Sequence, residues 1–210
     1  MKIPYAVIAF VKMQVFHLDF NINRSFIMDD EFLELCDELL KITYEEKISG
    51  NSVLEILKNY CSTISVFDMM AVSAVIIEEN KYVQASYKED SQKAYVETSI
   101  LSVKEILADN NDYGKSIDKE EFADAIKTLM SNHENQIEKS KTKFQLIGCM
   151  TSIYTTFLLE EPIHKVGTVF PGSLKVEEKD GKFYCPVKDA NIDTPNAVCN
   201  ICLAEQLDFK

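Results

Sequence analysis

Basic residues are few in this sequence, and arginine is almost absent, since Arg24 is the single one. The chain carries 22 Lys and Arg against 34 Asp and Glu, which gives a net charge of −12. Nucleic-acid binding requires clustered Lys and Arg that neutralise phosphates, and no basic stripe is present. We therefore expect no nucleic-acid partner. A cationic protein or a divalent cation is the kind of partner that this charge permits.

Long apolar runs are also lacking. No run approaches the ~18 uninterrupted apolar residues of a membrane span. The amino-terminal stretch, residues 4–20, is apolar enough to suggest a signal peptide, but Lys12 interrupts it and no small-x-small cleavage site follows it. We therefore expect a cytoplasmic protein with no membrane association, in which Tyr5, Ile8 and Phe16 bury in the core. In that compartment all six cysteines should be reduced thiols.

Glycine and proline are scarce, with six and five in the whole chain. Four of the prolines and three of the glycines follow position 161, so the composition changes there. The contents of 46% hydrophobic and 27% charged residues are typical of a globular protein. We predict a mainly α fold, a helical bundle over residues 1–161, with a small C-terminal β-hairpin and cysteine lobe over 162–210 packed on it.

Apolar residues at helical spacing predict the helices of the bundle. The first begins near Asp29 or Asp30, and Gly50 ends it. The remaining helices are expected at 53–60, from Ser65 or Asp68 towards Tyr82, at 95–107, and from about Asp118 to Glu160 with a possible break near Gly148. Pro162 sets the end of the last helix, because the residue before a proline disfavours helical backbone angles.

Asp180-Gly181 between alternating apolar residues predicts a two-residue hairpin turn within 174–187. This turn pairs Lys179 with Lys182 and Val176 with Cys185. Pro186 has no amide hydrogen, so pairing should end beside Cys185. One face of the hairpin should then carry Leu174, Val176, Phe183, Cys185 and Val187.

Three of the six cysteines lie in the last 26 residues, Cys185 and the C-x2-C pair Cys199 and Cys202. Thiolates together with an imidazole are the usual ligands of a tetrahedral zinc site. We expect zinc to be bound by these three cysteines, with His164 as the fourth ligand and Cys149 as its substitute. An iron–sulfur cluster is the less favoured occupant.

Two other interpretations of these cysteines stay open. Buried cysteine is often a small apolar core residue, in which case the C-x2-C pair is incidental. A C-x2-C pair at a helix start also suits thiol–disulfide exchange, but the strand–helix unit expected for that chemistry is not recognisable. Glu160 and Glu161 could act as acid or base beside an open zinc site, although solvated glutamates at a helix end are more common.

The segment from Asn110 to Glu121 can be aligned with a calcium-binding EF-hand loop. Asn110, Asp112, Ser116 and Glu121 then occupy ligand positions one, three, seven and twelve. Gly114 offers no side chain at position five, and Lys115 stands where the motif needs glycine. We therefore favour an ordinary helix–loop–helix connection, in which Ser116 or Asp118 caps the next helix.

Recognised catalytic motifs are missing from the sequence. There is no G-x-S-x-G, no H-E-x-x-H and no phosphate-binding glycine loop. His17 and His133 stand alone. Whether the protein is an enzyme therefore stays open.

The tail contains a combination of motifs that resembles a family of uncharacterised archaeal proteins, found chiefly in methanogens. The resemblance runs from about Ile64 to Gln206 and is strongest in Pro162-Ile-His164, Phe170-Pro-Gly172, Tyr184-Cys-Pro-Val187 and Ala197-Val-Cys-Asn-Ile-Cys202. Weaker matches lie at 64–70 and 81–87, and Lys165 stands where a proline is expected. The family has no assigned activity. The resemblance implies that His164, Cys185, Cys199 and Cys202 belong to one unit.

The leading hypothesis from the sequence is a cytoplasmic zinc-binding protein whose metal is structural and which acts as a binding or scaffold protein. The alternative is a zinc metalloenzyme with three protein ligands and one open position. A calcium-responsive helix pair is third. The partner, a protein or a small molecule, cannot be named from these patterns.

Overall fold

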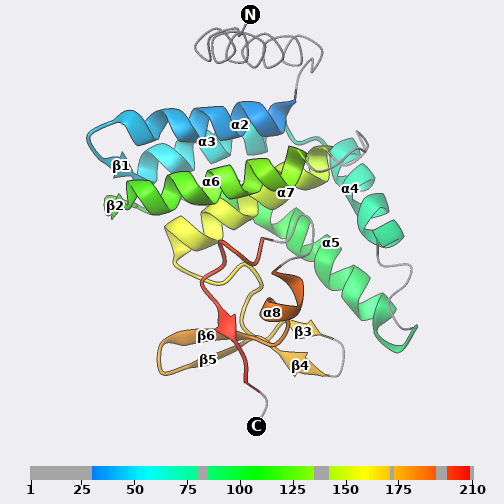
Figure 1. The fold of residues 1–210 in the computed structure, drawn as a ribbon. Helices are drawn as coiled ribbons and strands as arrows, with labels where there is room; N and C mark the ends of the chain where they lie inside the picture. Colours follow the sequence, from blue (N-terminus) through cyan, green and yellow to red (C-terminus); the bar gives the residue numbers. More distant parts are fainter. Residues whose placement is uncertain (1–29, 80–84, 135–141, 171–172, 193–197, 209–210) are drawn as a thin grey trace, which may run out of the picture. The chain divides into compact units, whose positions relative to one another are not determined.

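The computed structural model describes residues 30–79, 85–134, 142–170, 173–192 and 198–208 (Figure 1). The chain divides into two compact units, Met1–Glu31 and Phe32–Lys210. The second unit includes both the helical part and the C-terminal tail. The expected burial of Tyr5, Ile8 and Phe16 concerns residues outside the described ranges.

The second unit is mainly helical, as predicted. Its helices, some of them continued by a 3-10 or π turn, are α2 (Glu31–Lys41) with the 3-10 turn η1 (Ile42–Tyr44), α3 (Gly50–Thr63), α4 (Val66–Glu79), α5 (Ala85–Ala108), α6 (Lys119–Glu134), and α7 (Thr142–Ile153) with the π-helix η4 (Tyr154–Leu159). Helix α2 illustrates the pattern, because the residues that it buries recur every three or four positions.

One continuous apolar core holds these helices together. Helix α7 is central to it, since it contacts α3, α4 and α5. Its side chains Leu146, Met150 and Ile153 are almost fully buried. Helix α3 contributes Val53 and Leu57 to the same core. The helical bundle is thus built around α7 rather than around a sheet.

Two expected helix boundaries were wrong. Gly50 begins α3 instead of ending the preceding helix, and Ser49 is the N-cap residue, whose hydroxyl accepts a hydrogen bond from Asn51 N at 3.2 Å. Gly148 lies inside α7, and α6 ends instead at Glu134. Glycine is read from sequence as a helix terminator, but it is tolerated inside a helix that tertiary packing holds.

Short strands join the two helix–loop–helix units of the bundle. β1 (Ile48–Ser49) lies between α2 and α3, and β2 (Ser116–Ile117) lies between α5 and α6. They pair antiparallel, with Ile48 opposite Ile117 (Figure 1). Gly50 follows directly, and a Cβ atom at that position would lie only 2.8 Å from the backbone oxygen of Tyr113. The close approach of the two loops therefore requires glycine here.

The predicted hairpin turn and register are present, but the pairing ends at Glu177 opposite Tyr184. The expected Val176–Cys185 pair is not formed, because Val176 N donates to Thr168 O instead. β5 (Glu177–Lys179) pairs with β6 (Lys182–Cys185), with Lys179 opposite Lys182. Asp180 and Gly181 both have positive φ, 53° and 74°, as a two-residue primed turn requires. β6 ends at Cys185, just before Pro186, as expected.

The tail contains further pairing that the sequence did not indicate. Leu174–Lys175 forms β4 and pairs with β3 (Val169–Phe170) rather than continuing the hairpin. β7 (Glu205–Gln206) runs parallel to β6, and the short helix α8 (Lys188–Asn191) precedes the return of the chain. A small second core lies between these elements, formed by Phe170, Val176, Cys185 and Ala204 with Leu174, Phe183, Val187 and Cys202 at its edge.

Within the residues that the structure places, no single helix has the length and apolarity to cross a membrane. Helices α3 and α4 reach the required length and apolarity only when they are taken together, and the pair is bent by 91° at its junction.

Candidate functional site

The C-x2-C pair forms a tight turn in the tail. Ile201 N donates to Val198 O at 3.2 Å, and Cys202 N donates to Cys199 O at 3.3 Å. Both cysteines are half-buried. The turn is also attached to the helical body, because the Thr156 hydroxyl donates to Ile201 O.

The side chain of Lys188 also binds the C-x2-C turn through hydrogen bonds. Its ammonium group donates to the backbone oxygen of Cys202 at 3.0 Å and also to that of Ala204. Strand β7 then brings the following residues beside Cys185, where Leu207 N donates to Cys185 O at 3.0 Å. The C-x2-C turn is therefore held beside the end of the hairpin strand that carries Cys185.

Cys185 and Cys202 contribute to one apolar cluster. Cys185 is buried at the end of β6, and Cys202 packs at the edge of the cluster that contains it. Two of the three cysteines that the sequence grouped are thus brought together by the fold.

The three thiols also influence one another's pKa values. Burial raises the pKa of Cys199, and the charges of Cys185 and Cys202 raise it further. Burial likewise raises the pKa of Cys185; a backbone hydrogen bond at Val187 opposes this, and the charge of Cys202 adds to it. Without a cation, both thiols are held in the protonated form at neutral pH.

His164 lies in the turn after η4, beside the same cluster. Its ring meets the ring of Phe170 edge-on at a centroid distance of 5.3 Å, and that of Tyr95 at 6.1 Å. Burial lowers the pKa of His164, which favours the neutral imidazole, the form that binds metals. Tyr95 extends the same neighbourhood, since burial and then the charges of Cys185 and Cys199 raise its pKa.

The thiols and the imidazole are neighbours, but they do not converge on one point. Across the part of the chain that the structure describes, no group of three or more His, Cys, Asp or Glu residues is arranged to hold a metal ion. Cys149, the substitute fourth ligand, is buried in the main core on α7 among other side chains. The zinc site therefore remains a prediction.

The loop aligned with the calcium motif is occupied by internal hydrogen bonds. Asp112 accepts from the Asn51 amide group at 2.7 Å, and Asn51 Oδ1 accepts from Tyr113 N at 2.8 Å. Asp118 Oδ1 accepts from Glu121 N at 2.9 Å, the N-cap contact expected for an ordinary connection before α6. Ile117, at the apolar eighth position of the motif, pairs in β2.

A buried carboxylate that no sequence pattern singled out lies at the start of this loop. Asp109 is 7% exposed. Its Oδ2 accepts hydrogen bonds from the hydroxyl groups of Tyr113 and Tyr154, both at 2.7 Å, and its Oδ1 accepts from Asn111 N at 2.8 Å. Burial alone would raise the pKa of Asp109, but these bonds and the nearby charge of Lys58 outweigh it, so the pKa is lowered.

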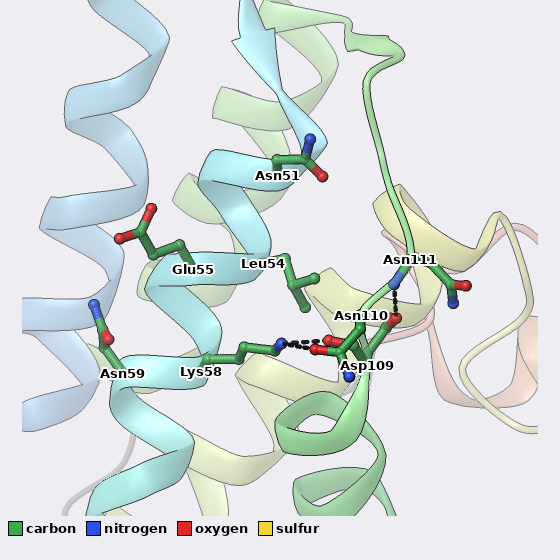
Figure 2. Close-up of a pocket in the computed structure, with 8 residues that line it drawn as sticks. All are labelled: Asn51, Leu54, Glu55, Lys58, Asn59, Asp109, Asn110 and Asn111. Carbon is green, nitrogen blue, oxygen red and sulfur yellow. Dashed lines mark hydrogen bonds between the residues drawn. The ribbon is translucent and has the colours of Figure 1, made fainter.

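Figure 2 shows the surface next to Asp109, where α3 faces the loop that follows α5. A shallow polar pocket of about 370 Å³ lies there. Lys58 spans it and donates to the backbone oxygen of Asp109 and to Asn110 Oδ1. The polar groups of Asn51, Lys58 and Asn110 are engaged within the protein, so the arrangement ties the loop to α3. The pocket is lined by Asn51, Leu54, Glu55, Lys58, Asn59, Asp109, Asn110 and Asn111.

The remaining sequence candidates are two glutamates and two histidines. Glu160 is exposed and forms an ion pair with Lys115, and Glu161 is exposed. The ring of His133 stacks on that of Phe32 at 4.2 Å. His17 is outside the described ranges.

Comparison with known proteins identifies relatives in methanogens. Two proteins of Methanothermobacter thermautotrophicus, both named UPF0305 protein, are 32% identical to this chain over 157 and 158 residues, covering 73% and 75% of it and 94% and 96% of the relatives. The UPF0305 protein MJ0646 of Methanocaldococcus jannaschii is 25% identical over 168 residues, covering 77% of this chain and 98% of the relative.

No solved structure matches the chain. The model of one protein family matches residues 49–207, which is slightly more than the resemblance of the tail and helical motifs suggested. The match includes the loop between α5 and α6, the Asp109 cluster and the cysteine tail, and it excludes α2 and Ile48. The chain belongs to this family, whose description is "Uncharacterized protein conserved in archaea (DUF2115)".

Proposed function

We propose that the protein binds one zinc ion in its C-terminal tail through Cys185, Cys199 and Cys202, with His164 as the fourth ligand. The observation that carries this proposal is the shared environment of the thiols. Cys185 and Cys202 contribute to one small cluster, and Cys199 is close enough that their charges raise its pKa. Three thiolates in one buried place repel one another, and a divalent cation removes that repulsion.

The donor set suits zinc. Thiolate and neutral imidazole are the ligands of structural zinc sites, and a closed four-ligand site carries no chemistry of its own. Since the thiols do not already converge, binding must draw the C-x2-C turn, the end of β6 and the His164 turn together. Metal binding is then coupled to ordering of the tail. The metal would cross-link the segments of the tail, and the protein would act in the cytoplasm as a binding or scaffold protein.

A zinc metalloenzyme is the second candidate, and the position of His164 favours it. The His164 ring packs edge-on against Phe170 and Tyr95, and these contacts could keep it from the metal. Three thiolates would then leave one coordination position to water. X-ray absorption at the zinc edge distinguishes a site of three sulfurs and one histidine from a site of three sulfurs and one water.

Elemental analysis of the full chain, purified without a histidine tag, tests the proposal. We expect about one zinc per chain, and a lower content in Cys185→Ser, Cys199→Ser and Cys202→Ser. Cys149→Ala is the matched control, because it removes a buried thiol of the main core and should leave the zinc content unchanged. A protein that takes up no zinc, or three variants that all keep it, would overturn the proposal.

A further inference from the structure

Helix α4 is apolar on the side that faces away from the bundle as well as on the side that faces it. Its inner side chains Val72 and Ile76 are buried, and the helix contacts α5 and α7. On the opposite side, Phe67, Met70 and Ile77 are 82%, 63% and 53% exposed. A helix that is apolar all round is normally covered on all sides, so the outer side of α4 needs an occupant.

The start of α4 is fixed, so these side chains are presented from a formed helix. Asp68 Oδ2 accepts hydrogen bonds from the backbone N and the hydroxyl group of Ser65, at 2.8 and 2.6 Å. In return, Asp68 N donates to the Ser65 hydroxyl at 3.2 Å. This reciprocal capping satisfies the free amides of the first turn and holds Phe67 in the first turn of the helix.

The exposed positions have the spacing of a helix–helix seam. Phe67, Met70, Ala74 and Ile77 follow one another at intervals of three, four and three residues, which is the a–d repeat of a two-helix contact. Ala71 and Ala74 are exposed between the larger side chains. The order of intervals is the same in both directions, so an antiparallel copy of the helix presents the same spacing.

We propose that this outer side of α4, the α4 seam, is the contact surface for a second copy of the chain, with the two α4 helices antiparallel about a two-fold axis. Phe67 of one protomer would face Ile77 of its partner, and Met70 would face Ala74. Such an isologous contact uses the same patch twice. Large side chains meet at the two ends of the seam, and each methionine meets a small alanine near its centre.

The charges along α4 are compatible with this occupant. In the antiparallel arrangement the residues flanking the seam are Val66, Ala71, Ser73 and Glu78, and Glu78 of one protomer lies opposite Val66 of the other. No like charges therefore face each other in the contact. An anionic membrane is disfavoured, because α4 has acidic residues and no basic one and the chain has a net charge of −12.

The patch is small for a permanent dimer. Three large apolar side chains and two alanines are exposed together on one helix, and a contiguous exposed apolar patch marks an interaction site. Two such patches together bury less than the ~1,600 Å² of a standard interface. We therefore expect a reversible dimer with a dissociation constant of roughly 10 μM, independent of zinc in the tail.

Sedimentation equilibrium of the full chain, over protein concentrations spanning roughly 1 to 300 μM, tests the proposal. The wild type should change from monomer to dimer, and Phe67→Lys should raise the dissociation constant at least about tenfold. Because Phe67 is exposed, its replacement should leave the circular dichroism spectrum unchanged. Tyr44→Lys, at an aromatic residue that is 88% exposed outside the α4 seam, is the control and should dimerise like the wild type.

Three results would overturn the proposal. One is a wild type that stays monomeric over the whole range. Another is a dimer that Phe67→Lys does not weaken. The third is a monomer that floats with neutral phosphatidylcholine vesicles and no longer does so as Phe67→Lys, which would assign the α4 seam to lipid instead.

Discussion

At the scale of the residue, Asp109 is a buried carboxylate on which three hydrogen bonds converge. Two tyrosine hydroxyls and a backbone amide donate to its carboxylate, and Tyr113 and Tyr154 come from the loop and from η4. Burial first, and then the hydrogen bond to Asp109, raises the pKa of both tyrosines. The hydroxyls therefore stay protonated and act as donors. One buried carboxylate joins α5, the β2 loop and the π-helix.

Replacing this carboxylate should be costly. We expect Asp109→Asn to lower the free energy of unfolding by about 2 kcal/mol. Both tyrosine hydroxyls donate to Oδ2, so an amide that keeps its oxygen there turns its NH2 group toward Asn111 N and leaves that backbone amide without an acceptor. Urea denaturation at neutral pH measures this change. Asp112→Asn is the control; that side chain is exposed, and its loss should cost less than about 0.5 kcal/mol.

The difference in stability between the wild type and Asp109→Asn should depend on pH. The pKa of Asp109 is lower in the folded state than in the unfolded state, so its charge stabilises the fold above the ordinary aspartate pKa of about 4. That contribution is lost as the pH falls through the folded-state pKa. The difference in stability between wild type and Asp109→Asn should therefore shrink below about pH 4. A difference that stays constant down to pH 2 would contradict this role.

At the scale of the element, the contact between the β1 and β2 loops depends on the absence of a side chain at Gly50. A Cβ atom at residue 50 would lie 2.6 Å from the Cβ of Tyr113 and 2.8 Å from its backbone oxygen. We expect Gly50→Ala to destabilise the protein by about 1–3 kcal/mol, although alanine is the better helix former. Thermal unfolding measures the effect.

Replacement of Gly148 by alanine should have the opposite effect on stability from the same replacement at Gly50. Gly148 is inside α7, and no atom outside its chain neighbours and its own helix backbone lies within 4 Å of the added Cβ. Alanine there should gain about 0.5–1 kcal/mol from helix propensity and from the lower entropy of the unfolded chain. If Gly50→Ala were as stable as Gly148→Ala, the close approach of the β1 and β2 loops would not be rigid.

The loop between α5 and α6 should not bind calcium at micromolar concentrations. Its carboxylate Asp112 is engaged with Asn51, and Asp118 caps α6, so the ligands of an EF-hand are not available in place. Isothermal titration of the metal-free protein should give no saturable heat. A saturable signal that disappears in Glu121→Gln would instead establish the calcium-responsive helix pair.

At the scale of the whole molecule, the tail and the helical body are stabilised differently. The body has a continuous core of long helices, whereas the cluster in the tail contains four buried residues. So small a core contributes little stability by itself. The division into 1–161 and 162–210 stays a prediction, since the tail is also attached to the body through Thr156 and through the Lys165–Glu105 ion pair.

If zinc is bound, its removal should affect the tail and the helical body differently. With zinc chelated, or in Cys202→Ser, we expect proteases to cleave within 162–210 at least about tenfold faster, because metal binding free energy is then lost from the tail. The helical body should remain resistant. Limited proteolysis followed by mass spectrometry measures both, and re-addition of zinc to the chelated wild type is the control. Equal resistance with and without metal would show that the tail folds without it.

Several features were determined by the sequence alone because they depend on neighbours in the chain. Asp180-Gly181 predicted the turn and the register of the hairpin, since its positive φ values allow one tight geometry. Pro186 predicted the end of β6, and apolar spacing predicted α2 and α4. The C-x2-C pair and the family resemblance could also be recognised in the sequence, because they are local patterns.

Contacts between distant segments were decided only by the tertiary structure. Pairing of Ile48 with Ile117 and the role of Gly50 at their junction depend on two loops far apart in the chain. Asp109 looks like any acidic residue after a helix until Tyr154 is folded against it. The proposed metal site lies between these cases. Its cysteines are grouped in the sequence, and packing brings Cys185 and Cys202 together. The convergence of all four ligands that the proposal requires would depend on the free energy of binding the metal.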